Sequence, residues 1–330
     1  MIGFEGNIWL WVGFTGFILT MLALDLGVFH RKAHRVGFRE AIFWSIFWTL
    51  LALAFNAWIY IHSGKEMGQQ FFAGYLLERA LSFDNIFVIV LVFAAFAVPD
   101  AFQHRVLFWG ILGALVMRAL FIGAGALLVS KFGWILYVFG AFLVYTGFKM
   151  AVAPEQEVRV EDNRVVKLAD RFLPLSPHYH GDKFWIHQDG KFLFTPLFVV
   201  LLVVEATDLI FAVDSIPAIF GVTNNTFLIY SSNVFAILGL RAMYFLVADL
   251  SQTFHLLKYG LAMILVVVGV KMCLPLLLLL PGVEASLPVL ADVVHHLHDA
   301  KGAGWILAII LGILVSSVLL SVVLPKRETA

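Results

Sequence analysis

The stretch EATDLIFAVDS, residues 205–215, places three carboxylates inside an otherwise apolar run. A second stretch, ERALSFDN at residues 78–85, adds two more in a similar setting. Each lies within a segment long enough to cross the roughly 30 Å hydrocarbon core of a bilayer as a helix. Carboxylates at that depth are rare, and they normally face a partner, a wet cavity or a bound ion. These two stretches therefore predict a membrane fold and mark where its functional site lies.

The rest of the chain has the composition of a membrane protein. Hydrophobic residues make up 62% of the 330 residues and charged residues 13%, with a mean hydropathy of +0.94, whereas soluble domains have about 45–50% and about 25%. We expect an all-α polytopic membrane protein with about nine transmembrane helices. Their approximate ranges are 7–29, 40–62, 70–97, 104–129, 132–151, 192–220, 226–248, 257–280 and 303–324.

Charge and cysteine content exclude several classes of function. The formal net charge is zero, which gives no support for nucleic-acid binding. Cys273 is the only cysteine, so the chain has neither a disulfide scaffold nor a cysteine-built metal site. The sequence also lacks the Gly-x-Gly-Asp signature of intramembrane aspartyl proteases and a His-Glu-x-x-His zinc motif. We therefore expect no enzyme activity and no organic cofactor.

Lysine and arginine placement predicts the orientation. The first connection, residues 30–39, carries four basic residues, which the positive-inside rule places in the cytoplasm. Alternating sides from there gives 14 basic residues to cytoplasmic segments and three to outside segments. The N-terminus is then outside and the C-terminus cytoplasmic. The long connection 152–191 is also cytoplasmic, with a short amphipathic helix expected over 161–173 and a hairpin at Asp189-Gly190.

The two acid-bearing stretches belong to a longer internal repeat. Three pairs of charged residues recur in the same order, at offsets of 130, 123 and 122 residues. They are Glu78 and Asp208, Arg118 and Arg241, and Lys149 and Lys271. Each copy covers three predicted helices, and an odd number turns the second copy over in the membrane. Inverted repeats of this kind build secondary transporters, whose sites lie near the membrane midplane between the repeats.

This repeat divides the chain into five parts. Two N-terminal helices occupy 1–69, the first three-helix repeat 70–151, the cytoplasmic connecting loop 152–191, the second, inverted repeat 192–280, and an extracytoplasmic loop with the last helix and a cytoplasmic tail 281–330. The loop of the last part contains His295, His296 and His298. We interpret these histidines as part of a solvated polar loop, with a metal site as the alternative.

Six acids fall inside the predicted helices, and each mid-span charge costs about 3 kcal/mol if unpaired. We predict that some of them bind a cation. The candidate ligands are Glu78, Asp84, Asn85, Glu205, Asp208 and Asp214. Candidates for the pathway or for support of the ligands are Asp25, Asn56, Ser82, Ser215, Asn233, Arg118 and Arg241. The alternative is that the acids form internal salt bridges, with Arg79, Arg118, Lys149, Arg241 and Lys271 as partners.

The ligand types indicate which cation. Carboxylates, amides and hydroxyls without thiolate or imidazole favour the hard divalent ions Mg²⁺, Ca²⁺ and Mn²⁺. Glu205 and Asp208 are three residues apart and share a helix face. We also expect Pro217 to open its helix, which would free backbone carbonyls and swing Asp214 toward Asp208.

At these residues the chain resembles the TerC/Alx family of integral membrane proteins. The resemblance rests on ERALSFDNIFV (78–88), WILYVFGAF (134–142), EATDLIFAVDSIPAIF (205–220) and NVFAILGLRAMYF (233–245). It covers most of the chain and is closest to the Alx branch. It implies a bacterial inner-membrane protein that exports Mn(II) from the cytoplasm, with a link to tellurite resistance. It also implies that the family's acidic positions are Glu78, Asp84, Glu205, Asp208 and Asp214. Ser82 and the outside loop depart from the family pattern without touching these acids.

Together these observations predict a secondary transporter that exports Mn(II) through a midplane carboxylate site, driven by protons. Its partners would be the bilayer, the divalent ion and protons, and no nucleic acid. Two alternatives stay open. One is an exporter of another cation, such as Ca(II) or a basic metabolite, and the other is a non-transporting membrane stress or assembly factor linked to tellurite resistance.

Overall fold

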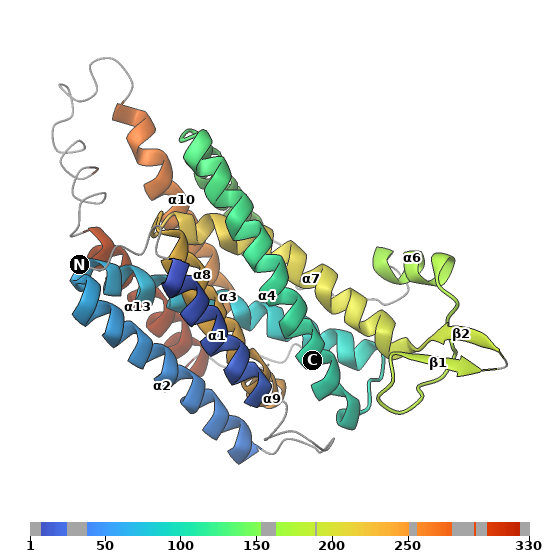
Figure 1. Cartoon of the computed structure of the whole chain (residues 1–330). Helices are drawn as coiled ribbons and strands as arrows, with labels where there is room; N and C mark the ends of the chain where they lie inside the picture. Colours follow the sequence, from blue (N-terminus) through green and yellow to red (C-terminus); the bar gives the residue numbers. More distant parts are fainter. Residues whose placement is uncertain are drawn as a thin grey trace.

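The computed structural model describes residues 8–24, 38–152, 163–188, 190–250, 256–278, 294 and 302–323, and nearly all of them are helical (Figure 1). The helices are α1 (Ile8–Leu24), α2 (Phe38–Ser63), α3 (Lys65–Ala95), α4 (Asp100–Lys131), α5 (Ile135–Val152), α6 (Arg164–Phe172), α7 (Pro196–Phe220), α8 (Thr226–Leu238), α9 (Leu240–Leu250), α10 (Leu257–Leu278) and α13 (Gly302–Val323). Within these residues the one sheet is an antiparallel hairpin of β1 (Trp185–Gln188) and β2 (Lys191–Phe194).

The helices confirm an all-α polytopic membrane protein. Seven segments of the described chain are long and apolar enough to cross a bilayer, namely α2, α4, α5, α7, α8 with α9, α10 and α13. Two long helices, α1 and α3, and the short α6 fall outside these seven. α1 is apolar but has 17 residues, and α3 has 31 residues that include Glu78 and Arg79. The sequence predicts nine membrane-spanning helices, and the described residues contain seven helical segments that meet the length and hydropathy expected of one.

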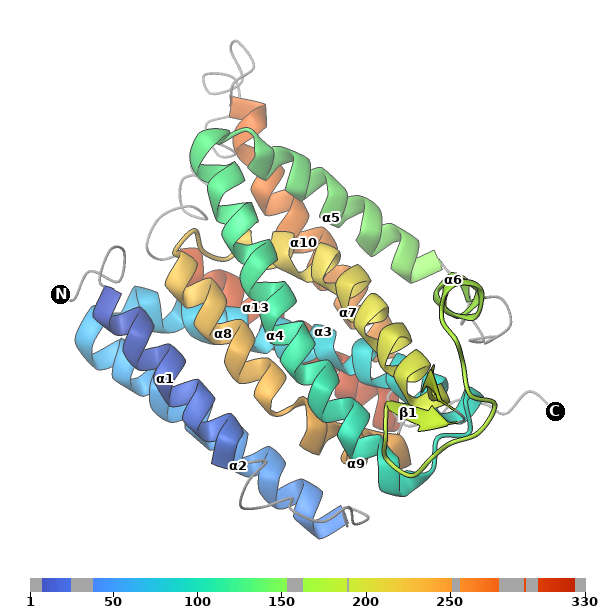
Figure 2. The same cartoon turned by 45° about the vertical axis from the view of Figure 1, so that its right-hand side comes forward.

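α3 lies at the centre of the bundle. It packs against α2, α7, α8, α9 and α13, while α4 packs against α7 and α8. α1 and α2 lie together on the outside of α8 (Figure 2). Aromatic rings join them there, because the ring of Phe14 lies 5.5 Å from both Phe55 on α2 and Phe227 on α8. The central position of α3 brings it into contact with helices from both halves of the sequence.

α5 and α10 form the most closely packed pair, and Figure 2 shows them side by side. Glycines make this possible. A Cβ on Gly269 would lie 2.6 Å from the carbonyl oxygen of Gly140, and one on Gly140 would lie 2.8 Å from the carbonyl oxygen of Gly269. Farther along, a Cβ on Gly147 would lie 2.7 Å from the carbonyl oxygen of Ala262. The two backbones therefore touch directly at two levels.

The long connection folds as the sequence predicts. The amphipathic helix is α6, capped where the Asn163 side chain accepts a hydrogen bond from the backbone N–H of Val165 at 2.9 Å. The hairpin turns at Gly190, whose φ of 71° favours glycine. The connection is fixed to the α3–α4 turn because the Tyr179 hydroxyl donates to the carbonyl oxygen of Phe96 at 2.8 Å. Burial raises the pKa of Tyr179, so this hydroxyl stays a donor.

The expectation that Pro217 opens its helix is wrong, since α7 continues to Phe220. Pro217 lies in the last turn of α7, and although it cannot donate a hydrogen bond to the carbonyl oxygen of Val213, the helix continues past it. The interruption lies instead at Gly239, between α8 and α9. There the Arg79 guanidinium donates to the carbonyl oxygen of Ala236 at 3.1 Å, and a Cβ on Gly239 would lie 2.3 Å from the guanidinium.

Candidate functional site

One face of α3 carries three buried polar side chains, Glu78, Ser82 and Asn85. Their spacing of four and three residues places them on a single stripe, and their exposed fractions are 0%, 1% and 3%. Within the described structure, one oxygen of each has no hydrogen-bond partner, namely Oε2 of Glu78, Oγ of Ser82 and Oδ1 of Asn85. Buried polar atoms nearly always have a partner. A row of three unpartnered oxygens is therefore a surface suited to a cation.

Arg118 of α4 is the positive charge beside this stripe. Its Nη1 atom forms a close ion pair with Oε1 of Glu78, and both side chains are at most 5% exposed. The same nitrogen donates to the hydroxyl of Ser215 at 3.1 Å and to the amide oxygen of Asn233 at 2.6 Å. Asn233 is itself held by a bond of 2.8 Å from its Nδ2 to the carbonyl oxygen of Ile229. One guanidinium nitrogen thus joins α3, α4, α7 and α8.

Asp208 extends the polar cluster onto α7. It is 8% exposed, and its Oδ1 accepts a hydrogen bond of 3.5 Å from the amide of Asn85. The charges of Arg118 and Glu78 act on it. One turn earlier on α7, Glu205 lies against Gly113 of α4, where a Cβ would fall 1.9 Å from its Oε1. The absence of a side chain at Gly113 gives the carboxylate its place.

A small cavity of about 10 Å³ lies beside Arg118. It is lined by Leu81, Asn85, Arg118, Met150, Phe211, Asp214 and Ser215. Its volume is at the lower limit for one water molecule. Asp214, at its edge, accepts a hydrogen bond of 3.4 Å from the hydroxyl of Thr146 on α5. The cavity therefore connects the Arg118 cluster with the carboxylate of Asp214.

The predicted ligands gather only in part. A hydrogen bond joins Asn85 to Asp208, and Glu78 lies on the same stripe of α3 as Asn85. Glu205 and Asp214 lie on the same helix as Asp208. The side chain of Asp84 lies outside the described residues, as do all of Asp25 and the three histidines at 295, 296 and 298. Among the side chains that are described, no three acids, histidines or cysteines are grouped to hold a metal ion.

The residues predicted to line the pathway or to support the ligands also fall partly inside the cluster and partly outside it. Ser82, Ser215, Asn233 and Arg118 belong to the cluster. Asn56 lies on α2 with a buried Oδ1 that has no partner in the described chain, and no hydrogen bond joins it to the acids. Arg241 is buried in α9 at 7% exposure.

The salt-bridge alternative holds for Arg118, which pairs with Glu78. Two other cations bind backbone carbonyl groups instead. Arg79 donates to Ala236, and Lys271 donates to Gly221 at 2.9 Å.

Comparison with known proteins agrees with this architecture. The family model described as "Integral membrane protein TerC family" matches residues 63–329. The chain belongs to the TerC family. It is similar to "Uncharacterized membrane protein STKORF319" of Myxococcus xanthus, with 49% identity over 286 residues, 87% of this chain and 89% of the relative.

Two further relatives extend the comparison. The TerC-family chain is similar to "Putative membrane-bound redox modulator Alx" of Escherichia coli (strain K12), with 46% identity over 272 residues, 80% of this chain and 85% of the relative. It is also similar to an "Uncharacterized membrane protein" of Rickettsia felis, with 41% identity over 261 residues, 79% of this chain and 87% of the relative. No solved structure matches.

Sequence reasoning missed Gly113 and Thr146 beside the polar cluster of this TerC-family protein, and it missed Gly239, which lies outside that cluster. The two glycines interrupt apolar helical segments, which is a signal for close approach of another group. That signal does not say which group approaches. Gly113 accommodates Glu205 and Gly239 accommodates Arg79, and these neighbours lie far away in the sequence.

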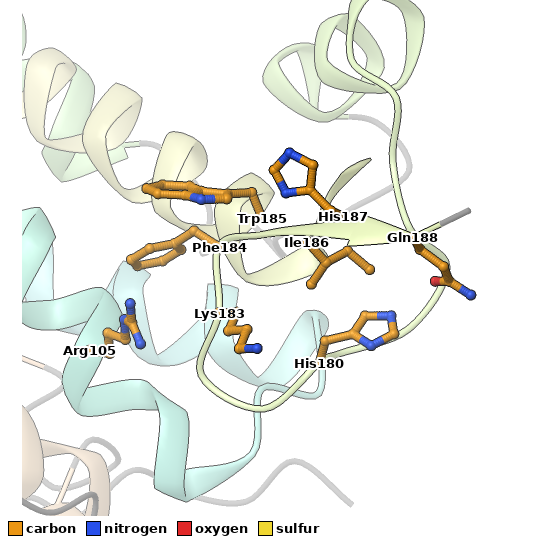
Figure 3. Close-up of a pocket in the computed structure, with 8 residues that line it drawn as sticks. All are labelled: Arg105, His180, Lys183, Phe184, Trp185, Ile186, His187 and Gln188. Atoms are coloured by element: carbon orange, nitrogen blue, oxygen red, sulfur yellow. The ribbon is translucent and has the colours of Figure 1, made fainter. Parts of the chain in front are cut away.

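A larger open pocket of about 610 Å³ lies elsewhere, on the connection between the halves (Figure 3). It lies beside β1 and includes Arg105 of α4. Arg105 pairs with Asp182 at 2.5 Å and lies over the ring of Phe184, 5.1 Å from its centre. None of the predicted ligands lines this pocket. The size of an opening is therefore a poor guide to the chemistry of this TerC-family protein.

Proposed function

We propose that this TerC-family protein is a secondary transporter that exports Mn(II) from the cytoplasm in exchange for protons. The proposal includes a bacterial inner-membrane location, an outside N-terminus and a cytoplasmic C-terminus. It includes no catalytic activity, no organic cofactor and no nucleic-acid partner. The observation that carries it is the row of unpartnered oxygens of Glu78, Ser82 and Asn85, buried at the contact between α3 and α7. Burying such groups costs stability and contributes nothing to packing.

The chemistry of the cluster favours a hard divalent cation. Glu78 and Asp208 supply carboxylates and Asn85 supplies an amide oxygen, and these groups come from two facing helices. We propose that Asp84, Glu205 and Asp214 complete the site during transport. Manganese in preference to calcium or magnesium follows from the family resemblance. Competition of radioactive Mn²⁺ uptake by Ca²⁺, Mg²⁺ and a basic amino acid, in vesicles of defined sidedness, separates these cargoes.

Helix packing supports the inverted repeat. α3 packs on α8 while α4 packs on α7, and these pairs are equivalent when the two copies exchange roles. The glycine contacts follow the same rule. With an offset of 122 residues, Gly140 corresponds to Ala262 and Gly147 corresponds to Gly269. The observed contacts join Gly140 to Gly269 and Gly147 to Ala262. Such reciprocal pairing is what a two-fold axis between two copies produces.

Mn²⁺ efflux from proteoliposomes tests the proposal. D208N and D214N each remove a charge with little change in shape, so we expect efflux to fall to the level of protein-free vesicles. D170N, at an exposed acid on α6, is the matched control and should transport at the wild-type rate. Wild-type efflux by folded D208N and D214N together would exclude transport through this site.

The name of the Escherichia coli relative supports a second candidate, a membrane factor that modulates redox state without transport. Here the thiol of Cys273 is the one group able to take part in thiol redox chemistry. It lies against Gly140 and donates to the carbonyl oxygen of Tyr137 at 3.6 Å. A thiol-based role requires loss of function in C273S, whereas transport predicts unchanged Mn²⁺ efflux. A non-transporting factor would also tolerate D208N and D214N but not surface changes in 152–191.

A further inference from the structure

The guanidinium of Arg118 makes the contacts expected of a bound cation. Its Nη1 atom touches a carboxylate, a hydroxyl and an amide oxygen, from Glu78, Ser215 and Asn233. These three groups come from α3, α7 and α8, and Arg118 reaches them from α4. Oxygen atoms from separate helices around one positive centre form the arrangement that a hard metal ion also uses.

We propose that Arg118 is a tethered counter-ion, which holds the position of the transported cation and leaves it when the divalent ion binds. The inference rests on the proposed function, because it describes how that site is filled when no cargo is present. Glu78, Ser215 and Asn233 then serve two cations in turn. Arg118 acts by positioning these oxygens and by competing with the cargo.

Charge explains why the position needs a permanent occupant. The carboxylate of Glu78 is fully buried, and an isolated ion in such a place is strongly unfavourable. An arginine keeps its proton under all physiological conditions, so Arg118 neutralises Glu78 whatever the proton supply. For the same reason Arg118 repels an arriving divalent ion and cannot become neutral to admit it. Binding therefore requires the guanidinium to move.

The surroundings show both an approach for the ion and a direction for the arginine. The oxygens of Glu78, Ser82 and Asn85 that Arg118 does not bind have no partner in the described structure, so they are the oxygens free to bind the cargo while the guanidinium is still in place. The small cavity lined by Arg118 is lined by Asn85 and Asp214 as well, and Asp214 is a second anionic partner for the guanidinium. This cavity holds at most one water molecule, so a guanidinium enters it only if the helices around it shift. Because Arg118 joins four helices, cargo binding changes their packing.

Calorimetry of Mn²⁺ binding to purified protein tests the inference. R118M removes the competitor, and we expect its dissociation constant to fall at least tenfold below that of the wild type. R79M is the matched control, because Arg79 is another interior guanidinium but bonds a backbone carbonyl group; its affinity should stay within about threefold of the wild type. Equal or weaker binding by R118M overturns the inference, even if the wild type binds and transports. Absence of binding by the wild type overturns the proposed function, and the inference with it.

Thermal stability gives an independent readout. R118M leaves Glu78 unpaired, so we expect a lower melting temperature without metal and a larger rise on adding Mn²⁺ than in the wild type. The double variant E78Q/R118M removes both charges and should regain metal-free stability without tight binding. If Arg118 were only structural, Mn²⁺ would not restore R118M. Should R118M fail to fold even with Mn²⁺ present, R118K decides, with an affinity above that of the wild type expected and an unchanged or lower affinity overturning the inference.

Discussion

At the scale of single residues, the Glu205 carboxylate occupies its position because Gly113 has no side chain. Gly113 leaves space on α4, and a methyl group in that space would overlap the carboxylate. A carboxylate at the end of a flexible side chain moves away at little cost. The consequence is a change of site geometry rather than of stability.

We therefore predict that G113A reduces Mn²⁺ efflux severalfold while the free energy of unfolding changes by less than about 1 kcal/mol. Efflux from proteoliposomes and denaturant unfolding in micelles measure the two effects. G123A, on the same helix with nothing within 4 Å of its Cβ position, should leave both quantities unchanged. A loss of efflux in G123A equal to that in G113A would point to helix propensity instead of Glu205.

The acids and their polar neighbours could be predicted from sequence because charges are rare in apolar segments. Their partners could not. The sequence offers five cations as candidate salt-bridge partners. Hydropathy does not distinguish Arg118, which binds Glu78, from Lys271, which binds a backbone carbonyl group. Which residue pairs with which across a helix interface depends on how each helix is rotated about its axis. The spacing of residues within one helix does not give this rotation.

At the scale of elements, long apolar runs predicted the helices well, and the Asp-Gly signal predicted the hairpin. The prediction for Pro217 was wrong because the loss of one hydrogen bond near the end of α7 did not stop the helix, which continues to Phe220. The break at Gly239 was missed because its cause, the guanidinium of Arg79, lies on another helix.

The α5–α10 contact gives an element-scale prediction. G269A places a methyl group 2.6 Å from the carbonyl oxygen of Gly140, and backbone cannot move aside as a side chain does. We expect the free energy of unfolding to fall by about 1–3 kcal/mol, as in other overpacked interiors. Denaturant unfolding in micelles measures it. G312A on α13, where nothing lies within 4 Å, is the control, and an equal loss there would rule out the backbone clash.

The connection between α5 and α7 gives a prediction that depends on pH. The folded pKa of Tyr179 lies above its ordinary value of 10.0 because the phenol is buried. Its contribution is therefore complete below about pH 10 and is lost as pH rises through the folded pKa. Y179F should cost about 1 kcal/mol at neutral pH through the lost hydrogen bond, and its stability should fall less steeply than that of the wild type above pH 10. Thermal unfolding across pH measures both, with Y145F, at an exposed tyrosine on α5, as the control.

At the scale of the whole molecule, the proposed orientation is open to direct labelling. C273A removes the one cysteine of the sequence, and single cysteines can then replace exposed Lys65 or Lys191. We expect a membrane-impermeant maleimide to label K65C in intact cells and K191C only in inside-out vesicles. The reverse pattern would invert the proposed direction of transport.

The overall plan followed from the sequence more fully than the site did. The charged pairs of the two proposed copies appear in order along the chain, so the repeat can be proposed without coordinates. How the copies meet is not readable, because the glycines of α5 and α10 resemble other glycines of apolar helices until the two backbones are seen in contact.

That backbone contact limits how the molecule can move. Carbonyl groups of α5 and α10 already touch glycines of the neighbouring helix. The two helices can therefore neither slide past each other nor come closer, and we expect them to move as one rigid pair. In the proposed transport cycle, the acids would be reached from each side of the membrane in turn by tilting of α3 and α7 against this rigid pair. In that cycle the fixed pair is held by glycine contacts between α5 and α10, and the helices that tilt, α3 and α7, carry the acids.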